Sequence, residues 1–303
     1  MAVTFEIEVP KKQVLKFYGQ EANSTNFHLG KVHVFLTDIE VKFERGDTLL
    51  DDKFKPQASG SIANPPFNLK SWTGETTLDV NPETEEPEDP RWRKWGLPPK
   101  GNANFAWMEH IDHHCVKKPR RWGIVFSRGT LSNADSSKIR KQMIENDEVL
   151  CVLALPIQLF TNTPIAAAIW IGGQKPKHRK GQTLFINAHG MGKMKTRTLR
   201  ILEEEEIEKI ANTFLAWTRD EGCNEEYEDE LGFCKTTAIE EIREHNSITT
   251  PGRYVGIPPI KEDGEPFEER MARLTRELND HFGESRELEN QIRESMEEFG
   301  FEL

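Results

Sequence analysis

An alternation of short apolar segments with amphipathic segments constrains the fold more than any other feature of the chain. The apolar segments have the length of buried strands, and between them apolar residues recur at helical spacing. The expected strands span 14–18, 39–43, 61–63, 122–127, 149–155, 164–171 and 184–187, and the expected helices span 21–38, 102–115, 136–145 and 203–218. Strands and helices that alternate at this spacing predict an α/β fold with a parallel, doubly wound sheet.

Charge is distributed unevenly along the chain. The formal net charge of −11 argues against a free-standing DNA-binding protein, because phosphate binding requires a cationic footprint. No Asp or Glu occurs from Val149 to Leu202, and this basic stretch contains Lys175, Lys177, Arg179, Lys180, Lys193, Lys195, Arg197 and Arg200. If DNA is the substrate, we expect its backbone on the basic stretch and further positive charge from a partner. The alternative is a solvated loop followed by a solvated, acidic helix.

The sequence predicts a cytoplasmic protein without membrane segments. Its longest apolar runs are too short to span a bilayer, and its first residues lack the pattern of a secretory signal. The four cysteines show no pairing or metal-binding spacing, and we expect reduced thiols at Cys115, Cys151, Cys223 and Cys234.

The most informative motif is Asn64-Pro65-Pro66-Phe67, directly after an expected strand. Ligands of α/β sheets bind beyond the carboxyl ends of strands. The amide oxygen of Asn64 and the carbonyl of Pro65 can accept the two hydrogens of an exocyclic amino group, while the two prolines hold these acceptors at fixed angles. Phe67 can stack on a base flipped out of a duplex. A turn beside a core phenylalanine is the alternative, but the position after a strand favours methyl transfer to an amino nitrogen.

Together with other motifs, this loop resembles the modification (M) subunits of type I restriction systems, which are N6-adenine DNA methyltransferases. The similar segments span 18–21, 46–48, 63–68, 101–107, 155–160, 232–235 and 251–256. The resemblance implies the Rossmann-like sheet of class I methyltransferases and S-adenosylmethionine as cofactor. It also implies DNA as substrate, and a specificity (S) subunit and a restriction (R) subunit as partners.

The resemblance also implies roles for individual residues. Glu21 matches the acid that holds the ribose hydroxyls of the cofactor, and Asp47 matches a residue near the cofactor's adenine. Residues 64–67 match the catalytic loop around the target adenine, and Asn64 also borders the cofactor. The run at 101–107 matches a helix that faces the pocket, without a chemical role. The alternatives are an ordinary charge at a helix start for Glu21 and a turn aspartate for Asp47.

The sequence departs from the family at its beginning. It contains no strand followed by a Gly-rich cofactor loop, so the first, central strand of the family's sheet is predicted to be missing. Residues 1–12 alternate apolar and polar side chains, as a half-buried strand does. We therefore expect an N-terminally truncated or split protein, whose missing part is lost or supplied by another polypeptide.

The pattern changes near residue 220. We expect a partial catalytic domain at 1–220, and a linker with a helical partner-docking region at 221–303. Residues 267–299 form one long helix or two, with a break at Gly283, and show a heptad seam with several polar members. The seam is expected to pack on a partner helix or on the chain's own domain.

Two other functions and one metal site are weighed against this prediction. The chain could be a non-catalytic remnant that only docks to a specificity subunit, or a methyltransferase of protein glutamine, which the length and the tail disfavour. His110 and His114 share a helix face, but no cysteine or carboxylate nearby in the sequence completes a zinc site, so none is expected.

Overall fold

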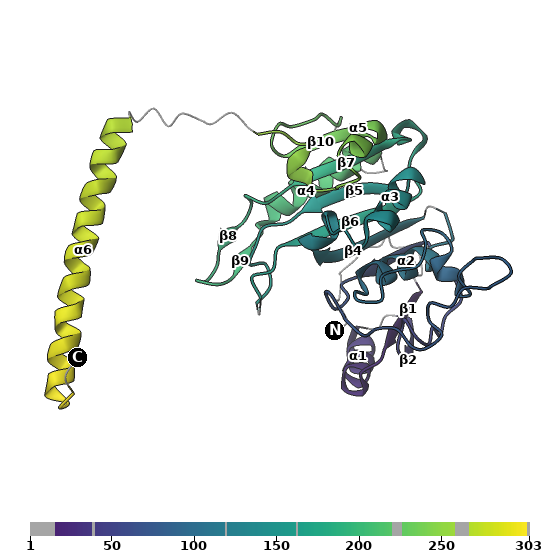
Figure 1. Ribbon diagram of the computed structural model, residues 1–303, viewed down its shortest axis with the longest axis horizontal. Helices are drawn as coiled ribbons and strands as arrows, with labels where there is room; N and C mark the ends of the chain where they lie inside the picture. The colour runs from purple at the N-terminus through teal and green to yellow at the C-terminus, as the bar shows by residue number, and fades with distance from the viewer. Residues whose placement is uncertain are drawn as a thin grey trace. The chain divides into compact units, whose positions relative to one another are not determined.

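The computed structural model describes residues 16–37, 40–118, 120–161, 163–219, 226–257 and 267–301, and the strand expected at 1–12 lies outside them. The chain divides into two compact units at 1–257 and 258–303 (Figure 1). In the first unit the strands are β1 (Phe17–Glu21), β2 (Val41–Arg45), β3 (Gly60–Ala63), β4 (Arg121–Ser127), β5 (Val149–Ala154), β6 (Ala167–Gly173), β7 (Gln182–Asn187), β8 (Lys193–Met194), β9 (Arg200–Ile201) and β10 (Cys234–Ala238). Its α-helices are α1 (Ser24–Thr37), α2 (Asn104–His114), α3 (Ser137–Glu145), α4 (Glu204–Thr218) and α5 (Ile239–Glu244).

The central sheet is mixed rather than parallel. Its strand order is β10-β7-β5-β6-β4-β3, and β6 runs antiparallel to both of its neighbours, as β10 does to β7. The pairs β3–β4 and β5–β7 are parallel. The strands expected at 61–63, 122–127, 149–155, 164–171 and 184–187 correspond to β3, β4, β5, β6 and β7. Strand β10 was not expected, and the expectation of a wholly parallel sheet is wrong. The carboxyl ends of β3, β4, β5 and β7 nevertheless meet at one edge.

Strands β1 and β2 form a separate parallel pair. In the part of the chain that the structure describes, no strand joins this pair to β3, the outermost strand of the central sheet. Among the described residues, the β1–β2 pair and the central sheet are therefore separate sheets. Helix α1 covers the pair by packing Phe27 and Gly30 on Phe43, with the two phenylalanine rings stacked at 5.0 Å.

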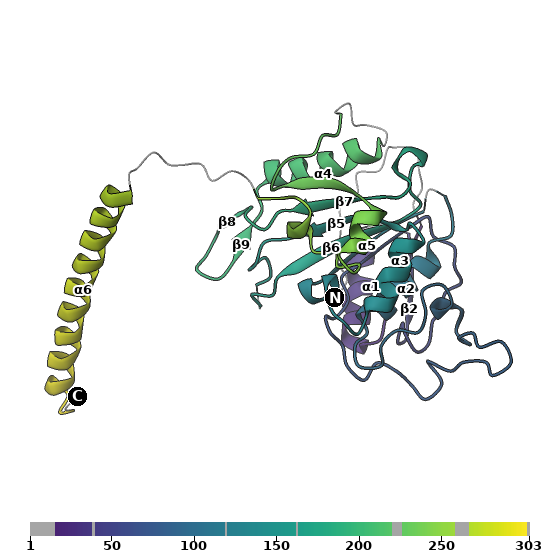
Figure 2. The ribbon, with the colours of Figure 1, turned by 45° about the horizontal axis from the view of Figure 1, so that its top comes forward.

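Apolar side chains fill both faces of the central sheet. One core contains residues of α2, α3 and α5, and the other contains residues of α4. Figure 2 shows α4 on one side of the sheet and α2 and α3 on the other. All six residues of β5 are buried, as expected of a central strand covered on both faces. Cys115, Cys151 and Cys234 are buried free thiols.

The second unit contains α6 (Phe267–Glu298), a single helix that continues through Gly283. Of the two alternatives, one long helix or two, the structure therefore shows one. None of the residues of α6 is buried, and the heptad positions Met271, Leu274, Leu278, Leu288 and Ile292 are exposed. The predicted docking of this seam on a partner stays a prediction.

Close packing between β6 and β4 requires glycine at position 172. A Cβ atom there would lie 2.0 Å from Cζ2 of Trp122, a ring that is 1% exposed. Gly123 on β4 offers a matched site, because nothing lies within 4 Å of the corresponding Cβ position.

We predict that Gly172→Ala lowers the free energy of unfolding by about 1–3 kcal/mol, because the buried indole has no space to move into. Gly123→Ala should leave the stability unchanged or raise it slightly, since alanine loses less backbone entropy on folding. Urea denaturation of both variants measures the difference. Equal stabilities of the two variants would contradict the packing described here.

Candidate active site

The motif of residues 64–67 lies directly beyond the carboxyl end of β3. Pro65 is buried, Phe67 is half-buried and Asn64 is exposed. In the described residues, no hydrogen bond occupies the Asn64 side chain. The Phe67 ring meets Phe160 edge to face, with the centroids 6.0 Å apart and the planes at 86°. Phe160 follows β5, whereas Phe67 follows β3. Segments after two different strands therefore form one aromatic pair beside the side-chain amide of Asn64.

Three asparagines fix this loop to the start of α2. Asn68 has a φ of +54°, in the left-handed region where asparagine is tolerated better than most residues. Its backbone N–H donates to Asn104 Oδ1 at 2.9 Å, and Asn104 Nδ2 donates back to Asn68 Oδ1 at 2.9 Å. Asn102 Nδ2 donates to the same oxygen at 3.0 Å. The segment 101–107, which had no role in the sequence analysis, therefore positions the loop.

A buried ionic network anchors α2 to the sheet. Asp112 of α2 accepts hydrogen bonds from Trp122 Nε1 at 2.8 Å and from Lys94 Nζ at 2.6 Å. Arg120 bridges Asp112 and Glu148 at 3.2 and 2.7 Å. The helix that holds the loop is therefore tied to β4 and to the start of β5.

Glu21 and Asp47 lie together at the end of the separate β1–β2 pair. Glu21 is the last residue of β1, half-buried, and Gly46 N donates to its carbonyl at 3.2 Å. Asp47 is exposed, and its Oδ1 accepts from Leu49 N and Leu50 N at 2.9 and 3.1 Å. The structure thus brings the two predicted cofactor residues together. They stand on a different sheet from Asn64.

The loop after β2 is held in place from two sides. Gln20 of β1 accepts from Lys53 N at 3.1 Å and donates to Asp51 O at 2.7 Å. From the other side, Arg91 donates to Thr48 O at 3.0 Å and to Leu49 O at 2.7 Å, and Asp89 pairs with its guanidinium at 2.6 Å. The long segment at 70–100 therefore supports the loop that carries Asp47.

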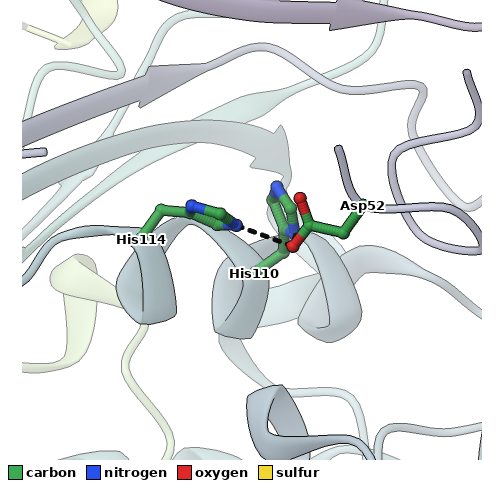
Figure 3. A group of neighbouring side chains, drawn as sticks. All are labelled: Asp52, His110 and His114. Atoms are coloured by element: carbon green, nitrogen blue, oxygen red, sulfur yellow. Dashed lines mark hydrogen bonds and ion pairs between the residues drawn. The ribbon is translucent and has the colours of Figure 1, made fainter. Parts of the chain in front are cut away.

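The same loop reaches α2 through Asp52, which meets His110 and His114 (Figure 3). His114 Nε2 lies 2.8 Å from Asp52 Oδ2, and His110 Nδ1 lies 3.9 Å from it. Burial, reinforced by the neighbouring His114, lowers the pKa of His110 to about 3, so this imidazole is neutral near pH 7. The carboxylate that the sequence analysis did not find beside the two histidines comes from 62 residues upstream of His114.

The basic stretch does not form one surface. Residues 174–181 follow β6 and precede β7, so they lie at the edge of the sheet opposite to the candidate site. The segment that contains β8 and β9 follows the carboxyl end of β7 and lies at the edge that carries Asn64. Of the basic residues in this stretch, only Lys193, Lys195, Arg197 and Arg200 belong to the segment at the edge that carries Asn64.

A solved structure shares the fold of this chain. The methyltransferase subunit of a type I restriction-modification system from Streptococcus thermophilus matches with a TM-score of 0.68 at 23% identity, over 80% of this chain and 55% of that one. The family model of N-6 DNA methylases matches residues 3–263. The chain belongs to the N-6 DNA methylase family.

Two curated relatives are type I methylase subunits. The HindI methylase subunit of Haemophilus influenzae is 39% identical over 295 residues, which are 95% of this chain and 62% of that protein. The MjaIX methylase subunit of Methanocaldococcus jannaschii is 36% identical over 294 residues, again 95% of this chain but 50% of that protein. The chain thus spans between half and two thirds of the length of these relatives.

We predict that Asn104→Ala destabilises the protein by about 1–3 kcal/mol, because it leaves the backbone N–H of Asn68 without its acceptor in a partly buried site. Asn146→Ala, at an exposed position after α3, serves as the matched control and should cost less than about 0.5 kcal/mol. Equilibrium unfolding measures both variants. Equal effects would remove the positioning role assigned to Asn104.

Glu109 makes stability depend on pH. It is 2% exposed, and neither carboxylate oxygen has a hydrogen-bond partner among the residues that the structure describes. Burial, together with the charges of Asp112 and Asp89, raises its pKa well above 4.5. The folded protein therefore binds this proton more tightly than the unfolded chain does, and its stability falls as the pH rises above 4.5 toward the raised pKa.

Glu109→Gln should remove this part of the pH dependence, because glutamine is neutral at every pH. We expect the variant to be the more stable protein at pH 8 and the difference to shrink as the pH falls toward 4.5, the pKa of an unperturbed glutamate. Thermal unfolding across this pH range tests the prediction. A difference that is constant with pH would show that the carboxyl does not titrate as described.

Proposed function

We propose that this chain transfers a methyl group from S-adenosylmethionine to the N6 atom of adenine in DNA, as the modification subunit of a type I restriction-modification system. The observation that carries the proposal is the exposed amide of Asn64 beyond β3, without an internal hydrogen bond and next to the Phe67–Phe160 pair. Membership of the N-6 DNA methylase family agrees with this chemistry.

In the proposed reaction, the chain acts by orienting the amino group of the target adenine. The amino nitrogen of adenine is a poor nucleophile because its lone pair is conjugated with the ring. Asn64 Oδ1 and the Pro65 carbonyl accept its two hydrogens, which draws the lone pair out of conjugation toward the methyl donor. Phe67 stacks on the flipped base, and the Asn68–Asn104 bonds keep the acceptors in position before the base arrives.

The residues at the end of β1 and β2 fit a nucleoside cofactor. Glu21 offers a half-buried carboxylate, a double acceptor suited to ribose hydroxyls, and the Asp47 turn lies beside it. S-adenosylmethionine supplies the methyl group when bound. In this proposal Glu21 holds the ribose, Asp47 borders the adenine, and Asn64 stands between cofactor and target base.

DNA binding requires help from partners in this proposal. The net charge is −11, and the segment around β8 and β9 carries the basic residues at the candidate edge. We propose that a specificity subunit supplies base recognition and docks on the heptad seam of α6, and that a restriction subunit joins this complex for cleavage. None of the described helices is long and apolar enough to cross a membrane.

We predict that Asn64→Ala lowers DNA methylation by about 100-fold or more, because the amino group loses an oriented acceptor. The chain is produced together with its specificity subunit, and N6-methyladenine in the target DNA is measured by mass spectrometry of nucleosides. The stability should change by less than about 0.5 kcal/mol, since the side chain is exposed.

Two further variants control this experiment. Asn146→Ala should methylate as the wild type does, because residue 146 precedes β5 at the opposite edge of the sheet. Glu21→Ala should raise the KM for S-adenosylmethionine. Methylation that survives Asn64→Ala would overturn the assignment of the loop, and a wild-type complex without methylation would favour a non-catalytic docking role.

A further inference from the structure

The cluster of Asp52, His110 and His114 has no role in the proposed methyl transfer. The two histidines are one helical turn apart on α2, and the aspartate comes from the loop after β2 (Figure 3). One nitrogen from each histidine and one carboxylate oxygen lie within 4.8 Å of one another. All three side chains are partly accessible, at 13%, 13% and 20% for His110, His114 and Asp52.

The hydrogen-bond chemistry of the cluster makes His110 Nδ1 an acceptor that lies beside a carboxylate oxygen. Arg91 Nη1 lies 3.2 Å from His110 Nδ1, and a guanidinium can only donate, so Nδ1 carries a lone pair rather than a proton. This nitrogen stands 3.9 Å from Asp52 Oδ2, which is also an acceptor. Two acceptors at this distance, with a second imidazole beside them, surround a position that suits a cation.

We propose that Asp52, His110 and His114 bind a divalent transition-metal ion of the zinc class. Two imidazole nitrogens and a carboxylate oxygen are a common donor set for zinc, with bonds of about 2.0–2.2 Å. On binding, His114 Nε2 exchanges its contact with Asp52 for the metal, and His110 closes toward the carboxylate. Three protein donors leave one position for water. The proposal does not rest on the methyltransferase assignment.

Arg91 is the main charge that opposes a metal ion here, and its surroundings compensate for it. Asp89 pairs with the guanidinium through both carboxylate oxygens, at 2.6–3.0 Å. Nη1 also keeps its hydrogen bond to Thr48 O at 3.0 Å when the His110 lone pair turns to the metal. The cation therefore enters a site that already contains one carboxylate for the arginine and another for the metal.

The site would act as a cross-link between the loop that carries Asp47 and helix α2. Asp52 lies in this loop, and His110 and His114 lie in the last two turns of α2. Metal binding replaces the His114–Asp52 and Arg91–His110 hydrogen bonds with three coordinate bonds. The proposal therefore predicts a gain in stability on metal binding, because the unfolded chain has no preformed site.

The test uses the full chain without a histidine tag, since a tag binds the same metals. Co²⁺ is titrated into the protein and the visible ligand-field absorption is followed, and Zn²⁺ is then added to displace it. We expect one Co²⁺ per chain, displacement by Zn²⁺, and a higher thermal midpoint with Zn²⁺. Asp52→Asn and His114→Ala should each weaken Co²⁺ binding by more than about tenfold, through the loss of one ligand.

His113→Ala is the matched control, because His113 stands on the same helix next to His114 but outside the donor set. It should bind Co²⁺ as the wild type does. Asp52→Asn preserves shape and can still accept a hydrogen bond from His114, so this variant is expected to keep the fold and lose only the carboxylate ligand. Wild-type protein without stoichiometric binding, or equal losses in the His113 and His114 variants, would overturn the proposal.

Discussion

The two loops of the candidate site have little secondary structure of their own, and hydrogen bonds to α2 give them their shape. At the start of the helix, Asn104 exchanges two hydrogen bonds with Asn68 and so fixes the loop with Asn64. In the last turn, His114 bonds Asp52 and fixes the loop after β2. Asp112 of the same helix accepts a hydrogen bond from the buried indole of Trp122, so α2 is fixed to the sheet. Through their bonds to α2, both loops are fixed relative to the sheet as well.

The sequence predicted the parts of this arrangement that depend on local pattern. The strand before Asn64 ends at a proline pair, which cannot continue a ladder, so the end of β3 was predictable. Helices α2, α3 and α4 lie within two residues of their expected bounds because their apolar periodicity is clear. The predicted roles of Glu21 and Asp47 came from the family resemblance and remain proposals, although the structure places the two residues side by side.

Other features were outside the reach of a single sequence. The direction of β6 cannot be predicted from its hydrophobic pattern, since a strand buried on both faces has the same pattern whether it is parallel or antiparallel to its neighbours. The position of Asp52 beside His114 depends on a contact across 62 residues, which spacing along the chain does not reveal. Whether Gly283 divides the C-terminal helix was also left open by the sequence, since a glycine inside a helix costs only about 1 kcal/mol, and α6 continues through it.

The attachment of both loops to one helix has a thermodynamic consequence. A ligand that orders the Asp47 loop restrains α2 through Asp52, and the restrained helix in turn restrains Asn68. The conformational entropy lost in the first binding event does not have to be lost again in the second. For ligands that bind at both loops, linkage would make this effect reciprocal, so that each would strengthen the binding of the other by the same factor. Helix α2 would therefore make the two halves of the site cooperative without any contact between their ligands.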